Sequence, residues 1–290
     1  MALATYTMIM KRLLSLFSAT LVAALIVPSV AFAAKPTPAQ PPAPTELKGY
    51  DISYPQCGNK DLKNLPTDQY FAIVGVNGGT AATYNSCLAD QLVWANKAKT
   101  GSNQPKVQLY VNTANPAQDT AYNWASWPTS GNTPYGPCTG VRTNDAACSW
   151  QYGWNRSAET EAYFVGKAQA AGISTNTGNY TWWLDVETMN SWQTGSNLAL
   201  NTAALEGFAA YYQAKGSTVG LYSTAVQWNS IVGSTVNSDS NLNGSPNWRP
   251  SGASLSNAVA NCSVAPLTAN GYISITQYVV KSLDTDHSCI

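Results

Sequence analysis

The chain has 290 residues, with 15 Lys+Arg against 15 Asp+Glu and a single histidine. Charged residues make up only 10% of it, and no basic cluster occurs that could neutralise phosphates, so we expect no nucleic-acid partner. The single histidine, His287, excludes any metal site that needs two imidazoles. Phosphate-binding glycine motifs are missing too, so we expect neither a metal nor another cofactor.

The first residues have the pattern of an export signal. Lys11 and Arg12 precede an apolar run over residues 13–27, and small residues lead up to Ala33. This order predicts a signal peptide over residues 1–33, cleaved to give a secreted protein. The alternative is an uncleaved membrane anchor, but a run of about 15 residues is short for a membrane span.

Residues 34–47 contain five prolines and should form an extended linker, so the folded domain is expected to span residues 48–290. We expect a monomer with no stable membrane association once the signal is removed. The polar surface with few charges is typical of secreted proteins that meet neutral polymers. The expected partner is therefore a polysaccharide.

All six cysteines lie after the predicted cleavage site. An even number in an exported chain indicates disulfides, which could pair in 15 ways. We predict that each cysteine pairs with its neighbour in sequence: Cys57 with Cys87, Cys138 with Cys148, and Cys262 with Cys289. Reduced buried thiols are the alternative, and a zinc site is disfavoured because no C-x-x-C spacing occurs.

Short apolar segments alternate with helical patterns along the domain. The expected strands are residues 49–53, 71–78, 107–113, 181–187, 218–223 and 272–279, with 247–251 as a weaker candidate. The expected helices are residues 85–99, 157–171 (with Ser157 as N-cap), 198–215 and 225–232. This alternation favours an α/β fold, an irregular TIM-like (β/α) barrel in a single domain with disulfides, over two domains. The stretch 116–154 is expected to be a long loop held by a disulfide.

Two acidic residues end the most informative strand. Residues two apart on a strand share a face, so Trp183, Asp185 and Glu187 should point the same way. The two acids then lie at the C-terminal end of the strand, where barrel enzymes keep their active sites. Asp51 follows the same rule on the first strand.

Acids that converge on one mouth repel one another, which keeps a proton on one beside an ionised partner. This combination of an acid and a carboxylate cleaves glycosidic bonds. The alternative is that Asp185 and Glu187 cap a helix or pair with basic residues.

Five motifs together resemble a known family. Gly49-Tyr50-Asp51-Ile52-Ser53, Phe71-Ala72-Ile73-Val74, Leu184-Asp185-Val186-Glu187, Gly220-Leu221-Tyr222-Ser223 and Ile275-Thr276-Gln277-Tyr278 with Leu283-Asp284 resemble, in this order, the strand motifs of glycoside hydrolase family 25 lysozymes. The resemblance implies an irregular α/β barrel. It also implies cleavage of the β-1,4 bond between N-acetylmuramic acid and N-acetylglucosamine in peptidoglycan.

The resemblance also implies roles for individual residues. Glu187 would be the general acid, and Asp185 would orient or electrostatically support the transition state, or assist the acetamido group of the substrate. Asp51 and Asp284 would match the first-strand and C-terminal aspartates of the family, whereas Asp286 falls where an asparagine commonly lies. The candidate substrate-binding residues are Asn77, Asn112, Trp183, Tyr222, Gln277 and Tyr278.

Three stretches depart from the family pattern. Residues 75–79 replace a Lys-Ala-Thr/Ser-Glu-Gly-like stretch, residues 110–113 replace a Tyr-His-Phe type signature, and Thr276 stands where a tryptophan is usual. We therefore expect a secreted glycosidase that acts on an N-acetylated glycan, with peptidoglycan as the expected substrate. The alternative is a catalytically inactive barrel that binds cell-wall glycan or another surface component.

Tryptophans in loop-like surroundings could stack on sugar rings. The candidates for such a platform are Trp124, Trp127, Trp150, Trp154 and Trp192. Ordinary packing is the alternative for each of them.

Overall fold

The computed structural model describes residues 47–117, 127–140 and 143–290. The predicted signal peptide, nearly all of the predicted linker and Trp124 lie outside these residues. Within the described residues, no helix has the length and apolar character that crossing a membrane requires.

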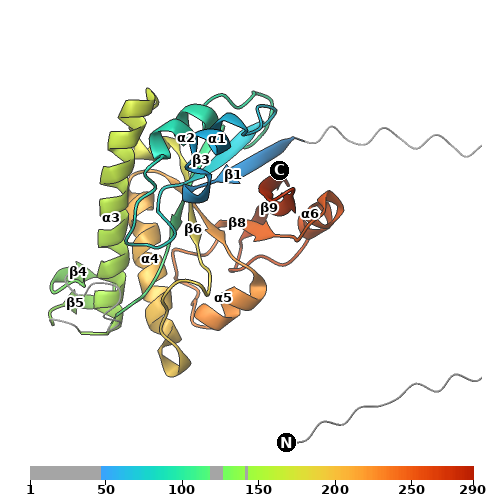
Figure 1. Ribbon diagram of the computed structural model, residues 1–290. Coiled ribbons are helices and arrows are strands. Elements are labelled where there is room, and N and C mark those ends of the chain that lie inside the picture. The colour runs from blue at the N-terminus through green and yellow to red at the C-terminus, as the bar shows by residue number, and fades with distance from the viewer. Residues whose placement is uncertain (1–46, 118–126, 141–142) are drawn as a thin grey trace, which may run out of the picture. The chain divides into compact units, whose positions relative to one another are not determined.

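The described part of the chain forms a closed barrel of eight strands (Figure 1). These strands are β1 (Lys48–Ile52), β2 (Phe71–Gly75), β3 (Val107–Asn112), β6 (Thr181–Asp185), β7 (Thr218–Tyr222), β8 (Pro246–Pro250), β9 (Tyr272–Val280) and β10 (Leu283–Ser288). Around the barrel they follow the order β1-β10-β9-β8-β7-β6-β3-β2. The expected irregular (β/α) barrel is thus confirmed.

The last strand makes the barrel irregular. β10 runs antiparallel to both of its neighbours, β9 and β1, whereas the other neighbouring pairs are parallel. A two-residue turn, Lys281 and Ser282, joins β9 to β10, and both residues have positive φ, 49° and 66°. Such turns match the natural twist of paired strands. Hydrophobic alternation in the sequence does not predict β10, because its outward and inward faces are both largely polar.

Glycine and aromatic residues fill the barrel interior in pairs across neighbouring strands. Gly49 stands in register with Phe71, Gly75 with Tyr110, and Gly220 with Trp183. A Cβ at any of these glycines would collide with the ring opposite. The glycines of three strands therefore provide the room that three inward-facing rings occupy.

Helices surround the barrel, and one small hairpin packs against a helix, α3. The helices are α1 (Asn59–Lys63), α2 (Leu88–Ala95), α3 (Ala146–Ala171), α4 (Leu198–Ala214), α5 (Ala225–Ile231) and α6 (Leu255–Asn261), with short 3-10 turns at Tyr54–Gln56, Thr177–Asn179 and Gly195–Asn197; the hairpin is β4 (Gly131–Thr133) with β5 (Gly136–Cys138). α3 and α4 lie side by side (Figure 1). They approach closely because Gly153 and Gly207 leave no side chain between the two backbones.

The longest helix begins earlier than expected. Ser157 is not its N-cap: α3 starts at Ala146, where the side chain of Asp145 accepts a hydrogen bond from the Cys148 amide at 2.7 Å. The expected loop therefore becomes helical from Ala146 onwards. Trp150 and Trp154, four residues apart, stack on each other with ring centroids 5.2 Å apart, as neighbours on one helix face do.

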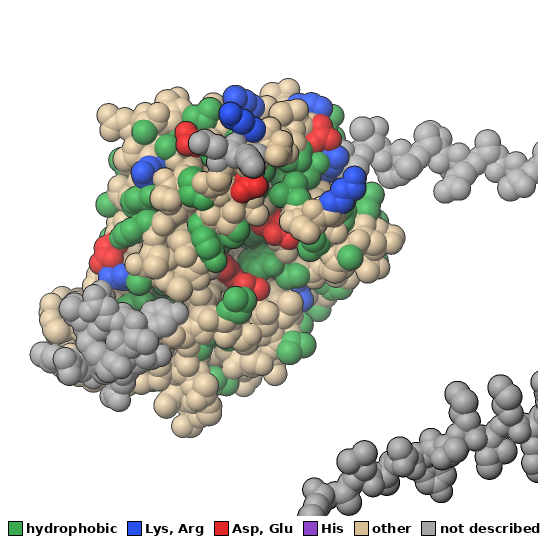
Figure 2. All heavy atoms as spheres, in the orientation of Figure 1, with side chains coloured by type: hydrophobic (Ala, Val, Ile, Leu, Met, Phe, Trp, Pro, Cys, Tyr) green, Lys and Arg blue, Asp and Glu red, His purple; other side chains and the backbone are tan. Residues whose placement is uncertain are grey.

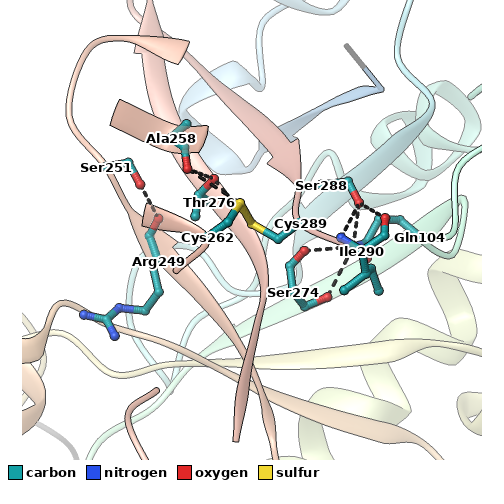
Figure 3. Close-up of a disulfide and its surroundings, with 10 residues drawn as sticks. All are labelled: Gln104, Arg249, Ser251, Ala258, Cys262, Ser274, Thr276, Ser288, Cys289 and Ile290. Carbon is teal, nitrogen blue, oxygen red and sulfur yellow. Dashed lines mark hydrogen bonds between the residues drawn. A yellow bond between two sulfur atoms is a disulfide. The ribbon is translucent and has the colours of Figure 1, made fainter. Parts of the chain in front are cut away.

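The three disulfides pair as predicted: Cys57 with Cys87, Cys138 with Cys148, and Cys262 with Cys289. The described residues contain no free cysteine. The last bridge ties the end of α6 to the end of β10 (Figure 3). Beside it, the Gln104 amide donates a hydrogen bond to the Ser288 hydroxyl at 3.1 Å, which further fixes the C-terminal strand.

Candidate active site

Four acidic side chains converge on one cavity at the C-terminal mouth of the parallel strands. The cavity has a volume of about 150 Å³ and is lined by Asp51, Tyr110, Asp185, Glu187, Tyr222, Trp248, Gln277 and Asp284. Asp284 reaches it from the start of β10, because that strand runs in the opposite direction and its first residues lie at the mouth. Figure 2 shows acidic side chains beside a hollow in the face of the molecule that it presents.

Asp185 lies at the end of β6 and is only 5% exposed. Its Oδ2 accepts a hydrogen bond of 2.6 Å from the amide of Asn112 on the neighbouring strand β3. Within the described structure its buried Oδ1 has no hydrogen-bond partner. Burial raises the pKa of Asp185 well above its usual value and the charge of Glu187 adds to this, while the Asn112 bond acts in the opposite direction.

Glu187 lies two residues beyond Asp185 and is only partly buried. Burial raises the pKa of Glu187, as does the negative charge of Asp284, whereas a hydrogen bond with Gln227 lowers it. The Trp192 indole donates a hydrogen bond of 2.8 Å to the Glu187 carbonyl and holds its backbone. The more exposed acid of the pair thus stands at the rim, where a proton can pass to a bound molecule.

Asp51 enters the cavity from β1 as the first member of a hydrogen-bonded chain. Its Oδ2 accepts a 2.9 Å hydrogen bond from Gln277, and the Gln277 Oε1 accepts one of 2.8 Å from the Tyr222 hydroxyl. Burial raises the pKa of Asp51 well above its usual value, with added effects from the charges of Asp286 and Asp284. Burial also raises the pKa of Asp284.

Aromatic rings form the wall around the acids. Trp248 lies with its ring centroid 4.4 Å from that of Tyr222 and 6.1 Å from that of Tyr110. Burial and the surrounding acids raise the pKa of both tyrosines, so each hydroxyl keeps its proton. The cavity therefore combines apolar walls with hydroxyl and carboxyl groups, a surface that suits a sugar.

Four of the six expected substrate-binding residues do not line this cavity. Trp183 is 1% exposed and packs inside the barrel, where its indole donates a hydrogen bond of 2.8 Å to Gln108. Tyr278 alternates with Gln277 along β9 and so faces the outside of the barrel. Asn77 is buried, and its Oδ1 accepts a hydrogen bond of 3.0 Å from the Asn112 amide of the main chain. The expectation that these side chains contact substrate does not fit their placement.

Asn112 likewise lies behind the cavity and acts on Asp185, while Tyr222 and Gln277 do line it. The expected tryptophan platform is not found there: of its described members, Trp127 and Trp150 are buried, Trp154 packs against Trp150, and the Trp192 indole is bonded to the Glu187 carbonyl. None of these four lines the acidic cavity. Trp150 and Trp154 lie on α3, and Trp127 stacks on Tyr152 of the same helix.

Sequence reasoning missed two residues that act on the acids. Gln227 lies in the first turn of α5, where the Thr224 hydroxyl caps its backbone amide at 3.0 Å. The Thr-x-x-Gln spacing signals a helix start, but not that the glutamine side chain turns to Glu187. Trp248 lies on β8, the strand with the weakest sequence signal, and donates a hydrogen bond of 2.9 Å to Asp286.

Among the described residues, no three His, Cys, Asp or Glu side chains lie where they could hold a metal ion together. The fold and the cavity together define a (β/α) barrel with a mouth lined by carboxyl groups. That class can be set beside proteins of known identity.

Part of the chain resembles a lysozyme-like family. The family model described as Lys-1, lysozyme-like protein 1, matches residues 156–243, which include Asp185 and Glu187. No curated protein matches the chain. The resemblance to lysozymes drawn from the strand motifs is thus confirmed by the family model over this part of the chain.

Solved structures that match the chain include three described as lysozyme, family 25 glycosyl hydrolase or muramidase. The bacterial lysozyme of Streptomyces coelicolor is 16% identical over 85% of this chain and 93% of its own, with a TM-score of 0.46. The family 25 glycosyl hydrolase of Bacillus anthracis is 14% identical over 84% and 88%, with a TM-score of 0.45. The muramidase of Trichobolus zukalii is 15% identical over 83% and 93%, with a TM-score of 0.46.

Proposed function

We propose that the protein is a secreted glycoside hydrolase that cleaves β-1,4 bonds of an N-acetylated glycan, with peptidoglycan as the substrate. The observation that carries this proposal is the convergence of Asp51, Asp185, Glu187 and Asp284 on one cavity walled by aromatic rings. The lysozyme-like family model supports the substrate class. Carboxyl groups flanking a bond are the usual means of glycoside hydrolysis.

Glu187 is the general acid of the proposed reaction. It is less buried than Asp185, and partial burial together with the charge of Asp284 raises its pKa and so favours its protonated form. In the first step Glu187 gives this proton to the glycosidic oxygen as the bond to the sugar carbon breaks. The leaving chain departs as an alcohol, and positive charge develops on the remaining sugar ring. Water then adds to that sugar carbon and returns a proton to Glu187, which completes the hydrolysis.

Asp185 stabilises that positive charge as a carboxylate. The Asn112 amide favours the ionised form because it donates a hydrogen bond to Oδ2. The free Oδ1 can accept a hydrogen bond from the substrate, and an acetamido N–H is a fitting donor. A negative group fixed in a buried site stabilises developing charge more strongly than water does.

Export is part of the proposal. Three disulfides in one domain fit an oxidising compartment outside the cytosol. The mature protein would act as a monomer on the polysaccharide, without nucleic acid and without stable membrane association.

The test is glycan cleavage by Glu187→Gln. This variant keeps the shape of the side chain but removes the proton donor, and we expect release of reducing ends from purified cell walls to fall at least about a hundredfold. Glu159→Gln is the matched control, because Glu159 lies on the exposed side of α3 in an ion pair with Arg156. It should cleave like the parent.

The assay also separates the alternative function. A barrel that only binds cell-wall glycan would retain walls in a pull-down without releasing reducing ends from the parent protein. Cleavage by Glu187→Gln at the parental rate would refute the role of Glu187. A parent that neither binds nor cleaves would refute the proposed function as a whole.

A further inference from the structure

One buried carboxyl group near the cavity has no part in the proposed reaction. Asp286 on β10 is fully buried, and its Oδ1 accepts the hydrogen bond from the Trp248 indole. No hydrogen-bond donor of the described residues reaches its Oδ2. A buried carboxylate oxygen with no donor is costly, so another group has to compensate it.

Asp51 is the group in position to do so. β1 and β10 pair with Asp51 opposite Asp284 and Gly49 opposite Asp286. Asp51 and Asp286 are therefore diagonal neighbours on the inner face of the barrel, within reach of each other. Side-chain hydrogen bonding between the two carboxyl groups raises the pKa of Asp51 and lowers that of Asp286, and such a bond can form only when one of the two carries a proton.

The surroundings of this pair favour one negative charge and not two. The titratable groups that face Asp51 are Asp284 and Asp286 from β10, Asp185 from β6, Tyr110 from β3 and Tyr222 from β7, with Glu187 beyond β6. All of these are acids. No lysine or arginine in the described ranges forms an ion pair with Asp51 or Asp286.

We propose that Asp51 and Asp286 share one proton, and that Asp286 is a positioning residue that holds Asp51 at the cavity as a neutral acid. Asp51 carries the proton and donates it in a hydrogen bond to Asp286, whose charge the Trp248 indole stabilises. The other oxygen of Asp51 accepts the bond from Gln277. Each group in the chain from the Trp248 indole through Asp286, Asp51 and Gln277 to the Tyr222 hydroxyl then has a hydrogen-bond partner.

The shared proton of Asp51 and Asp286 rests on the proposed function only for its role in catalysis. In the proposed reaction it leaves the negative charge of the cavity to Asp185 and Asp284, and it fixes Gln277 and the Tyr222 hydroxyl in place. Burial is the largest cause that raises the pKa values of Asp51 and Asp286, and the raised values agree with one proton retained by the pair. The strand register that makes Asp51 and Asp286 diagonal neighbours, and the buried Asp286 Oδ2 without a donor among the described residues, carry the inference.

The experiment is infrared spectroscopy of the full chain at neutral pH, in H₂O and D₂O, on the parent and on Asp286→Asn. An asparagine amide can donate to an ionised Asp51, so the variant no longer needs the shared proton. We expect the parent to show a carboxylic-acid C=O band that Asp286→Asn lacks. Asp51→Asn should lose the same band, and the double variant should lose one band and not two. Asp239→Asn, at an exposed site, should keep it.

Proton counting provides a second readout that a folding defect does not imitate. The pH dependence of the unfolding midpoint gives the number of protons released on unfolding. Near neutral pH this number should be smaller by one in Asp286→Asn than in the parent. An unchanged number, or a parent spectrum from which neither substitution removes a carboxylic-acid band, would overturn the shared proton. Both readouts are independent of glycan cleavage, so a failure of the proposed function would leave them intact, and the reverse also holds.

Discussion

The amide of Asn112 on β3 donates a hydrogen bond of 2.6 Å to Asp185 on β6, and the two residues stand in register on neighbouring parallel strands. The barrel itself, and not a flexible loop, therefore sets the orientation of this carboxyl group. The other oxygen of Asp185 is buried and has no hydrogen-bond partner within the described structure.

Asn112→Ala should impair the proposed hydrolysis. Without the amide donor the ionised form of Asp185 loses a hydrogen bond to a charged group, worth about 1.5–3 kcal/mol, so the rate of glycan cleavage should fall about tenfold to a hundredfold. The measurement is kcat on purified cell walls. Thr113→Val removes a bond to the Asp185 carbonyl instead of the carboxylate, and its effect on kcat should be smaller. Equal effects would contradict the role of Asn112.

Gln227→Ala should move the pH profile of cleavage. The hydrogen bond from Gln227 lowers the pKa of Glu187, so its loss raises that pKa further. Because a general acid is active only while protonated, the alkaline limb of kcat/KM should shift to higher pH. The neighbouring Val226→Ala, at an exposed position on α5, should leave the limb where it is. A shift towards acid would be incompatible with this arrangement.

Folding stability should decrease as pH rises above about 4, the usual range of unfolded aspartates. Burial raises the pKa of Asp51 and of Glu187 in the folded protein, so the folded state keeps protons that the unfolded chain releases. Each retained proton lowers the unfolding free energy by about 1.4 kcal/mol per pH unit until the folded pKa is passed. Urea unfolding at several pH values measures this, and a midpoint that increases steadily towards alkaline pH would contradict it.

Gly220→Ala should destabilise the barrel by about 1–3 kcal/mol, because the added methyl group meets the ring of Trp183 in a filled interior. Gly166→Ala offers a matched control on α3, where a Cβ has open space around it. That substitution should stabilise the protein by about 0.5–1 kcal/mol through helix propensity. Thermal unfolding of both variants checks the pair, and the prediction fails if both shift the midpoint in the same direction.

Removal of the Cys262–Cys289 bridge by a double serine substitution should lower the unfolding free energy by about 3–4 kcal/mol, from the loop-closure entropy of its 27-residue separation. The Cys57–Cys87 bridge spans 30 residues, so its removal should cost a similar amount. Chemical denaturation of the two variants tests this. A bridge whose removal leaves the midpoint unchanged would show that the entropic account does not apply to it.

Much of the barrel could be predicted because hydrophobic strands alternate with helices in an order that only parallel pairing explains. On β6, the alternation of Trp182 and Leu184 with Trp183 and Asp185 correctly gave the face that each residue presents. The disulfide pairs followed from proximity in sequence. The strand alternation and the disulfide pairs are patterns of residues close in sequence, and the folded structure agrees with both.

The remainder depended on contacts between distant segments. The inner face of β10 carries Asp284 and Asp286, and its outer face is also largely polar. Hydrophobic periodicity therefore could not reveal this strand. The start of α3 was misplaced because its first turns are rich in residues that also occur in loops. Likewise, nothing in the local sequence shows that Gln227 reaches Glu187 or that Trp248 reaches Asp286.

The short connection between β9 and β10 has a consequence for how the chain tolerates change. Successive residues of a strand face opposite sides, so one inserted residue between Val280 and Leu283 could slip the final strand by a single position. Both of its aspartates would then swing to the outer wall and two outward side chains would enter the barrel. The composition of the mouth is therefore set by the length of a two-residue turn, and that length is less free to vary than its exposed position suggests.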